Sequence, residues 1–221
     1  MNRRPLLWTA IICLLIMFAV SAYAWVTLPA GSQIPTHFGV NGQPDAYSSK
    51  AFGLLFMPLL SVVIFGLLYL VPAIDPRRTN IAKSATAYNI IAIGAMVLLT
   101  AVDVAAVAYA LGSQLDIAVI VSVGVGLLFV AIGFALPRLK SSYLVGIRTP
   151  WTLTSDLSWR KTHVLGGWLF IAFGVLLIAT GLWLPTAMAP WILFGGIAVI
   201  VLVPTVYSYV VWRSDPDRRP Q

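Results

Sequence analysis

The sequence contains no glutamate, a single cysteine and little charge of either sign. Only 10% of its 221 residues are charged, whereas a soluble domain averages about 25%. Together with 60% hydrophobic residues, this excludes an ordinary soluble protein. The one cysteine, Cys13, has no partner, so no intrachain disulfide can form and cysteine pairing does not indicate the compartment.

Motifs that carry catalysis are also missing. There is no His-Glu-x-x-His zinc pair, no Gly-x-Ser-x-Gly turn for a nucleophilic serine and no phosphate-binding glycine loop. The two histidines, His37 and His163, are expected on opposite faces of a membrane, so they cannot share a metal ion. We therefore expect no enzymatic activity, no cofactor and no metal site.

Long apolar runs dominate what is present. A hydrocarbon core of about 30 Å needs about 20 apolar residues of helix, because a helix satisfies its own backbone hydrogen bonds in lipid. The expected fold class is all-α: a polytopic membrane helical bundle with six transmembrane helices. The predicted spans cover residues 5–27, 51–73, 86–111, 117–136, 164–184 and 190–212.

The positive charges are distributed asymmetrically between the two sides of these spans. All Lys and Arg residues except Lys50 fall in the termini or in the connections after the second and fourth spans. Cytoplasmic loops retain positive charge, so both termini are predicted to be cytoplasmic, as an even number of spans requires. The formal charge of +7 thus reflects topology, and we expect no direct binding of nucleic acid.

The first span has a second interpretation. Arg3 and Arg4 precede an apolar run that ends in Ala22-Tyr23-Ala24, a pattern that signal peptidase could cut, which would leave five spans. Because apolar residues continue through Trp25 and Val26, a retained helix is favoured.

The connection 28–50, expected outside the cytoplasm, is rich in turn-forming residues, which favours short extended segments over helix. His37 could take part in binding, although a hydrogen-bonded loop histidine is the simpler interpretation. The residues that we expect to face a ligand here are Pro35, His37, Phe38, Asn41, Gly42, Asp45 and Lys50.

The connection 137–163 is the longest one predicted on the cytoplasmic side. Glycine and proline interrupt any helix in its first part, after which Thr154 or Ser155 is expected to cap a helix that continues into the fifth span. Its Trp and Arg residues would also suit a membrane interface, which is the alternative to a partner-binding role.

Two side-chain pairs are expected within that capped helix. Asp156 and Arg160 are four residues apart and are predicted to form an ion pair, while Trp159 and His163, at the same spacing, are predicted to make a ring contact.

One acidic residue, Asp103, is predicted inside a span, with Thr100 one turn before it. A charge at the bilayer centre costs about 2.5 to 3.5 kcal/mol on insertion scales, so an acid there is a functional candidate. The simpler alternative is a hydrogen bond to a hydroxyl such as that of Thr100 or Tyr109. In the fifth span, Gly167, Gly174 and Gly181 lie seven residues apart and predict close helix packing.

The run Gly-Ile-Arg-Thr-Pro-Trp-Thr-Leu at 146–153, followed by Trp159, Thr162-His163 and Gly166-Gly167, resembles the signature of the SdpI family of bacterial membrane proteins. The segment 34–50, with Pro58, resembles the small domain of unknown function that often precedes it. We therefore expect an N-terminal two-helix module, 1–73, with an extracytoplasmic loop at 28–50. An SdpI-like four-helix region, 74–221, would follow, with a cytoplasmic motif loop at 137–163.

The resemblance implies a multi-pass protein of the bacterial plasma membrane that protects its cell from a secreted peptide toxin. In the family's namesake it also implies that a small winged-helix repressor is held at the membrane. The residues expected to bind such a cytoplasmic partner are Gly146, Arg148, Thr149, Pro150, Trp151, Thr152, Trp159 and His163. Two alternatives stay open: a small proton-linked transporter that uses Asp103, and a repressor-sequestering receptor without immunity activity.

Overall fold

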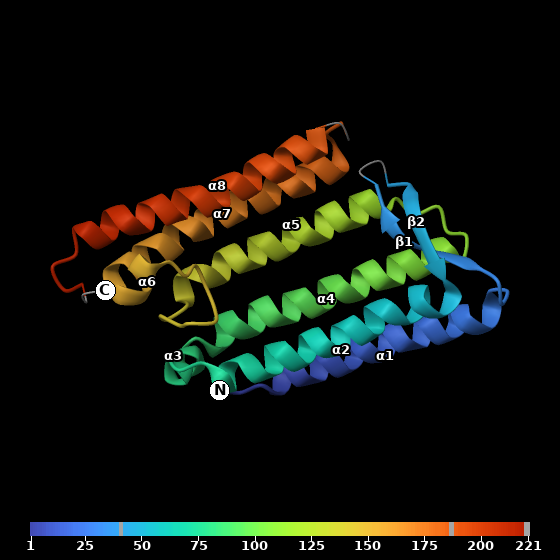
Figure 1. Ribbon diagram of the computed structural model, residues 1–221, viewed down its shortest axis with the longest axis horizontal. Coiled ribbons are helices and arrows are strands. Elements are labelled where there is room, and N and C mark those ends of the chain that lie inside the picture. The colour runs from blue at the N-terminus through green and yellow to red at the C-terminus, as the bar shows by residue number, and fades with distance from the viewer. Residues whose placement is uncertain (40–41, 186–187, 219–221) are drawn as a thin grey trace.

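The computed structural model describes residues 1–39, 42–185 and 188–218, which form an elongated bundle of long helices (Figure 1). Six of them are long and apolar enough to span a membrane, as predicted. They are α1 (Arg4–Thr27), α2 (Lys50–Ile74), α4 (Ala85–Ala110), α5 (Ile117–Ala135), α7 (Asp156–Leu182) and α8 (Ala189–Arg213). The shorter elements are strands β1 (Gln33–Phe38) and β2 (Pro44–Ser49), helices α3 (Arg78–Lys83) and α6 (Pro150–Thr154), and the 3-10 turn η1 (Leu136–Arg138).

The bundle has two different ends. The strands lie at one end, which we call the hairpin end, whereas α3, α6, the start of α1 and the end of α8 lie at the other, which we call the loop end (Figure 1). Of the Lys and Arg residues that the structure describes, only Lys50 belongs to the hairpin end; Arg219 lies outside the described residues. That the loop end faces the cytoplasm stays a prediction from this charge asymmetry.

The connection between α1 and α2 departs from the expected all-α class. β1 and β2 pair in an antiparallel hairpin, which confirms the extended segments predicted there. The turn closes with a hydrogen bond of 2.8 Å from the Gly39 amide to the Gln43 carbonyl, and Gly42 takes a φ of 74° that a residue with a side chain rarely adopts. Proline and glycine in this segment oppose a helix, which explains the exception.

A proline inside α2 joins this helix to α1. Pro58 has no amide hydrogen, so the carbonyl of Leu54, four residues earlier, loses its helical donor. The Ser21 hydroxyl of α1 donates to that carbonyl at 2.8 Å, and Ser21 is buried. In lipid no water can take this place, so the proline fixes α1 beside α2.

The same arrangement occurs near the loop end of α2. Pro72 leaves the carbonyl of Leu68 without its helical donor, and the Tyr88 hydroxyl of α4 donates to it. The Arg3 guanidinium adds a hydrogen bond of 2.9 Å to the Tyr69 carbonyl. The three N-terminal spans are therefore fastened together by side chains that replace missing backbone donors.

Glycines bring α5 and α7 into close contact. A Cβ on Gly133 would lie 2.6 Å from the Gly167 carbonyl oxygen, and one on Gly126 would lie 2.6 Å from that of Gly174. Such distances leave no room for a side chain, so the two backbones touch directly. The packing role predicted for Gly167, Gly174 and Gly181 is confirmed, since a Cβ on Gly181 would lie 2.9 Å from a side-chain atom of α5.

We expect Gly133→Ala to destabilise the protein by about 1–3 kcal/mol, because the added methyl group must push α5 away from α7. The measurement is thermal unfolding of the full-length protein in detergent micelles. Gly195→Ala is the matched control, since a Cβ on this glycine of α8 has open space around it. Equal melting temperatures for the two variants would contradict the close packing.

Candidate functional site

The hairpin is held in place by helices α1, α2, α4 and α5. Ile34 is buried in an apolar cluster that joins α1, α2 and α4. The ring of Phe38 meets that of Tyr109 of α4 edge to face, with centroids 5.3 Å apart. At the turn, a Cβ on Gly42 would lie 2.8 Å from the carboxylate of Asp116, the N-cap residue of α5. The hairpin thus has a fixed inner side and an outward side.

The outward side presents a paired histidine and aspartate. His37 Nδ1 and Asp45 Oδ1 lie 2.5 Å apart, and their side chains are 70% and 54% exposed. The nearby ring of Tyr47, which the sequence did not single out, is also exposed. Lys50 is instead occupied: its Nζ donates to the Leu28 carbonyl at 2.6 Å.

The other residues predicted to face a ligand have different positions. Pro35 and Gly42 are buried, so they shape the hairpin and are not open to a partner. Phe38 is half-buried against Tyr109. Asn41 lies outside the described residues.

At the loop end, a buried carboxylate from the end of α2 holds the motif loop, residues 137–163. Asp75 is 2% exposed and follows the last residue of α2. Its Oδ2 accepts from the Ser142 hydroxyl at 2.7 Å and from the Leu144 amide at 2.9 Å. Its Oδ1 accepts from the Arg77 amide at 2.6 Å. Sequence reasoning missed Asp75, although it is an isolated acid in a connection that is otherwise cationic.

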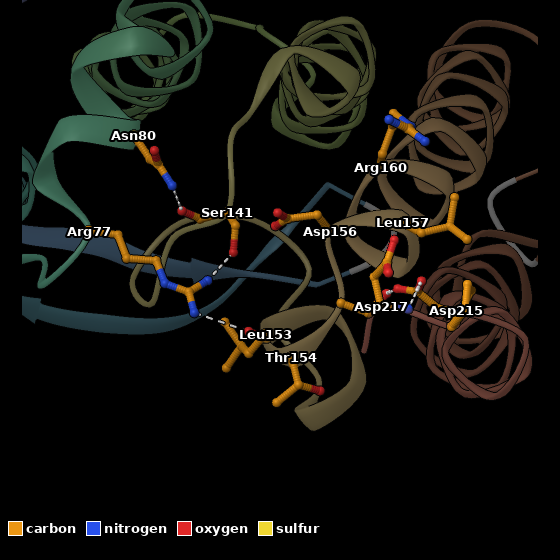
Figure 2. A pocket seen from close by; sticks show the side chains of 12 residues that line it. Arg77, Asn80, Ser141, Leu153, Thr154, Asp156, Leu157, Arg160, Asp215 and Asp217 are labelled. Carbon is orange, nitrogen blue, oxygen red and sulfur yellow. Dashed lines mark hydrogen bonds between the residues drawn. The ribbon is translucent and has the colours of Figure 1, made fainter. Parts of the chain in front are cut away.

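The side chains of Arg77 and Asn80, from the same connection, form further hydrogen bonds with the loop (Figure 2). The Arg77 guanidinium donates to the Ser141 hydroxyl and, at 3.0 Å, to the Leu153 carbonyl, and it lies over the ring of Tyr143. The Asn80 amide donates to the Ser141 carbonyl at 2.8 Å. Residues 141–144 and Leu153 of the loop are therefore positioned relative to α2 and α3.

Within the motif, two threonines begin the short helix α6. The Thr149 hydroxyl accepts from the Thr152 amide at 3.1 Å, and the Thr152 hydroxyl accepts from the Thr149 amide at 2.9 Å, which makes a reciprocal capping box. The Thr149 hydroxyl also lies 2.9 Å from that of Ser208 in α8. Both threonines are buried, so they fold the loop and tie it to α8. This short helix was not predicted.

The tryptophan and histidine of the motif are buried in α7. The predicted ring contact is confirmed, because Trp159 and His163 stack with centroids 4.0 Å apart. His163 Nε2 accepts from the Ile147 amide at 3.0 Å, which assigns the ring hydrogen to Nδ1, 2.8 Å from the Trp159 carbonyl. Gly146 has a φ of 105°, and a Cβ there would lie 2.5 Å from His163 Nε2, so only glycine fits.

Ser155 is the N-cap of α7 and accepts from the Ser158 amide at 2.9 Å, which confirms one of the two predicted caps.

The motif residues that remain open to a partner are few. Arg148 and Pro150 are exposed, and the Arg148 guanidinium donates to the Tyr143 carbonyl at 3.0 Å. Trp151 is half-buried, and the centroid of its ring lies 5.1 Å from that of the Tyr209 ring.

A polar cavity of about 520 Å³ lies beside the motif loop and is drawn in Figure 2. Both Asp156 and Arg160 line it, but the ion pair predicted between them is wrong: among the described residues, only His37 and Asp45 form one. Figure 2 shows the Asp156 and Arg160 side chains pointing in different directions. Acids and bases are mixed around this cavity, since Arg77 and Asp217 also line it.

Inside the bundle, Asp103 is 1% exposed, and its Oδ2 has no hydrogen-bond partner among the described residues. The predicted bonds to hydroxyls are wrong, because the Thr100 hydroxyl donates to the Met96 carbonyl at 2.9 Å and no bond joins Asp103 to Tyr109. The described residues contain no group of three or more His, Cys, Asp or Glu that could hold a metal ion.

Comparison with known proteins finds two regions of this chain that match families. Residues 138–208 match the SdpI/YfhL protein family, and residues 12–62 match a domain of unknown function, DUF1648. The Immunity protein SdpI of Bacillus subtilis (strain 168) is 23% identical over 216 residues, which cover 96% of this chain and 97% of that protein. No solved structure matches. This multi-pass membrane protein therefore has one region that matches DUF1648 and, after it, one that matches the SdpI/YfhL protein family.

Proposed function

We propose that this protein is an immunity protein of the bacterial plasma membrane, which protects its cell from a secreted peptide toxin at the hairpin end. The relative named as an immunity protein aligns over nearly the full length of both chains. The observation that carries the proposal is the hairpin itself. Its inner side is anchored on α4 and α5, while the polar pair His37–Asp45 is displayed outward.

We further propose that the motif loop binds a cytoplasmic regulator, a small winged-helix repressor. Strand β2 ends at Ser49, which caps α2 directly, and α2 runs without a break for 25 residues to Asp75, the residue that holds the loop. One continuous helix thus connects the two candidate binding surfaces. At the loop end, Arg148, Pro150 and Trp151 are the motif residues available for contact, and Arg and Trp are frequent in binding hot spots.

Deleting the gene is expected to sensitise the host to its toxin, and the wild-type gene is expected to restore protection. The double variant His37→Ala, Asp45→Ala should weaken protection about tenfold or more, because it removes the exposed polar pair that a peptide would contact. The measurement is the inhibitory concentration of candidate toxic peptides, with membrane abundance checked by immunoblot. Asp217→Ala, an exposed acid at the loop end, is the control. Unchanged sensitivity of the deletion strain to every toxin tested would argue against immunity.

The regulator is tested by co-purification from the host membrane. Arg148→Ala is expected to lower the recovered DNA-binding partner about tenfold or more, because it removes an exposed charged contact while the buried motif residues still hold the loop. Arg78→Ala, an exposed cation of the same end, should leave recovery unchanged. A regulator lost with Arg148→Ala in a strain without toxin protection would support a receptor without immunity activity. Recovery unaffected by Arg148→Ala would contradict this binding surface.

Asp103 favours a second candidate function, a small proton-linked transporter. A buried intramembrane acid with an unpartnered oxygen is a typical feature of proton pathways. Here Asp103→Asn should abolish proton uptake into proteoliposomes loaded with a pH-sensitive dye, whereas Asp156→Asn, at the exposed loop end, should not. Loss of toxin protection in Asp103→Asn would not distinguish the two functions, so proton flux is the readout. Wild-type proteoliposomes without flux would exclude the transporter.

A further inference from the structure

The cations of the loop end fall into two groups. In one group the guanidinium also donates within the protein, as those of Arg77 and Arg148 do to carbonyls of the motif loop. In the other group the side chains are exposed and make no hydrogen bond or ion pair with any residue that the structure describes; its members are Arg4, Arg78, Lys83, Lys140, Arg160 and Lys161. The second group is therefore available to something outside the chain.

Three cations of the second group, Lys83, Lys140 and Arg160, line one cavity. It measures about 430 Å³ and lies next to the cavity of Figure 2, with which it shares Asn80, Ser141, Asp156 and Arg160. Lys83 comes from the end of α3, Lys140 from the segment after η1, and Arg160 from α7. Trp159 is a buried wall residue whose indole nitrogen already donates to the Leu139 carbonyl at 2.8 Å. The charged side chains of this cavity that have no partner among the described residues are thus mainly cationic.

The cavity lies where three candidate spans end. Lys83 precedes the first residue of α4 by two positions, and Lys140 follows the end of the fourth span at the same spacing. Arg160 is in the second turn of α7. Residues at such positions are level with lipid headgroups, where phosphate groups are concentrated.

Charge distinguishes this cavity from its neighbour. Three cations face one acid, Asp156, whereas the neighbouring cavity has Asp215 and Asp217 in addition to Asp156 against two arginines. Only the first has the excess of positive charge that an anion requires. Basic pockets between span ends are a recognised form of lipid-headgroup site, and Lys and Arg are the usual donors to phosphate.

We propose that Lys83, Lys140 and Arg160 bind a phosphate group presented by an anionic lipid headgroup of the adjoining leaflet. Asp156, at the edge of the same cavity, accepts from a hydroxyl group of the headgroup, so a glycerol headgroup fits the site. This site is separate from the outward hairpin and from Arg148, and it stands whether or not the protein confers immunity.

The test uses the full-length protein in detergent micelles, with thermal unfolding recorded as phosphatidylglycerol is added. The wild type is expected to show a saturable rise in melting temperature that phosphatidylcholine with the same acyl chains does not produce. The double variant Lys83→Gln, Arg160→Gln should bind phosphatidylglycerol about thirtyfold more weakly, and Lys140→Gln about fivefold, at roughly one cation's contribution per substitution. Lys161→Gln, an exposed neighbour that does not line the cavity, is the matched control.

The arms of the experiment separate the possible results. Lipid-free melting temperatures equal to the wild type show that a variant is folded, and the single Lys140→Gln variant serves if the double variant is not. Inorganic phosphate that reproduces the rise and competes with phosphatidylglycerol would keep the phosphate site but overturn its assignment to lipid. Equal stabilisation of wild type and all variants by phosphatidylglycerol would overturn the site.

Discussion

The carboxylate of Asp75 is the interaction on which the arrangement of the loop end depends. It accepts three hydrogen bonds, two from the motif loop and one from its own connection. A buried donor left without its acceptor costs about 1–3 kcal/mol, so the buried Ser142 hydroxyl, which donates to Asp75, favours this position of the loop. Arg77 and Asn80 add hydrogen bonds to Leu153 and Ser141 of the same loop. One acid thereby joins the SdpI/YfhL region to the helix that begins in the DUF1648 region.

This anchoring divides the family-like motif into residues with different tasks. Thr149, Thr152 and His163 are buried and use their polar atoms on the loop itself. Arg148 and Pro150 belong to the same loop but remain exposed. Most of the specific residues of this short motif thus determine how the loop folds. The part left exposed for the proposed binding of a regulator is small.

Local rules predicted much of this structure from the sequence. The spans were predictable because an apolar run of about 20 residues has few alternatives in lipid. The Ser155 cap and the Trp159–His163 contact followed from spacing along one helix. The extended segments at 28–50 followed from turn-forming residues, although their pairing into a hairpin departs from the expected all-α class.

Contacts between distant segments were not predictable in the same way. Nothing in the sequence relates Asp75 to Ser142, because their meeting depends on how the two parts of the bundle are packed. The Asp156–Arg160 pair failed because spacing brings two side chains near each other but does not fix where each one points. For α5, a signal was present: Gly126 and Gly133 repeat the seven-residue interval of the α7 glycines, and comparing the two intervals would have indicated the pairing.

The prolines of α2 have a consequence for how this protein can move. A helix without interruptions can rotate or slide against a neighbour and keep every backbone hydrogen bond. α2 cannot do so, because rotation away from Ser21 or Tyr88 would leave a bare carbonyl in hydrocarbon. The first three spans are therefore held together by hydrogen bonds to α2, whereas α5 and α7 are held by direct contact of their backbones. The hairpin and Asp75 connect these two groups of helices at opposite ends of the bundle, so a displacement of one group against the other would have to break contacts at both ends.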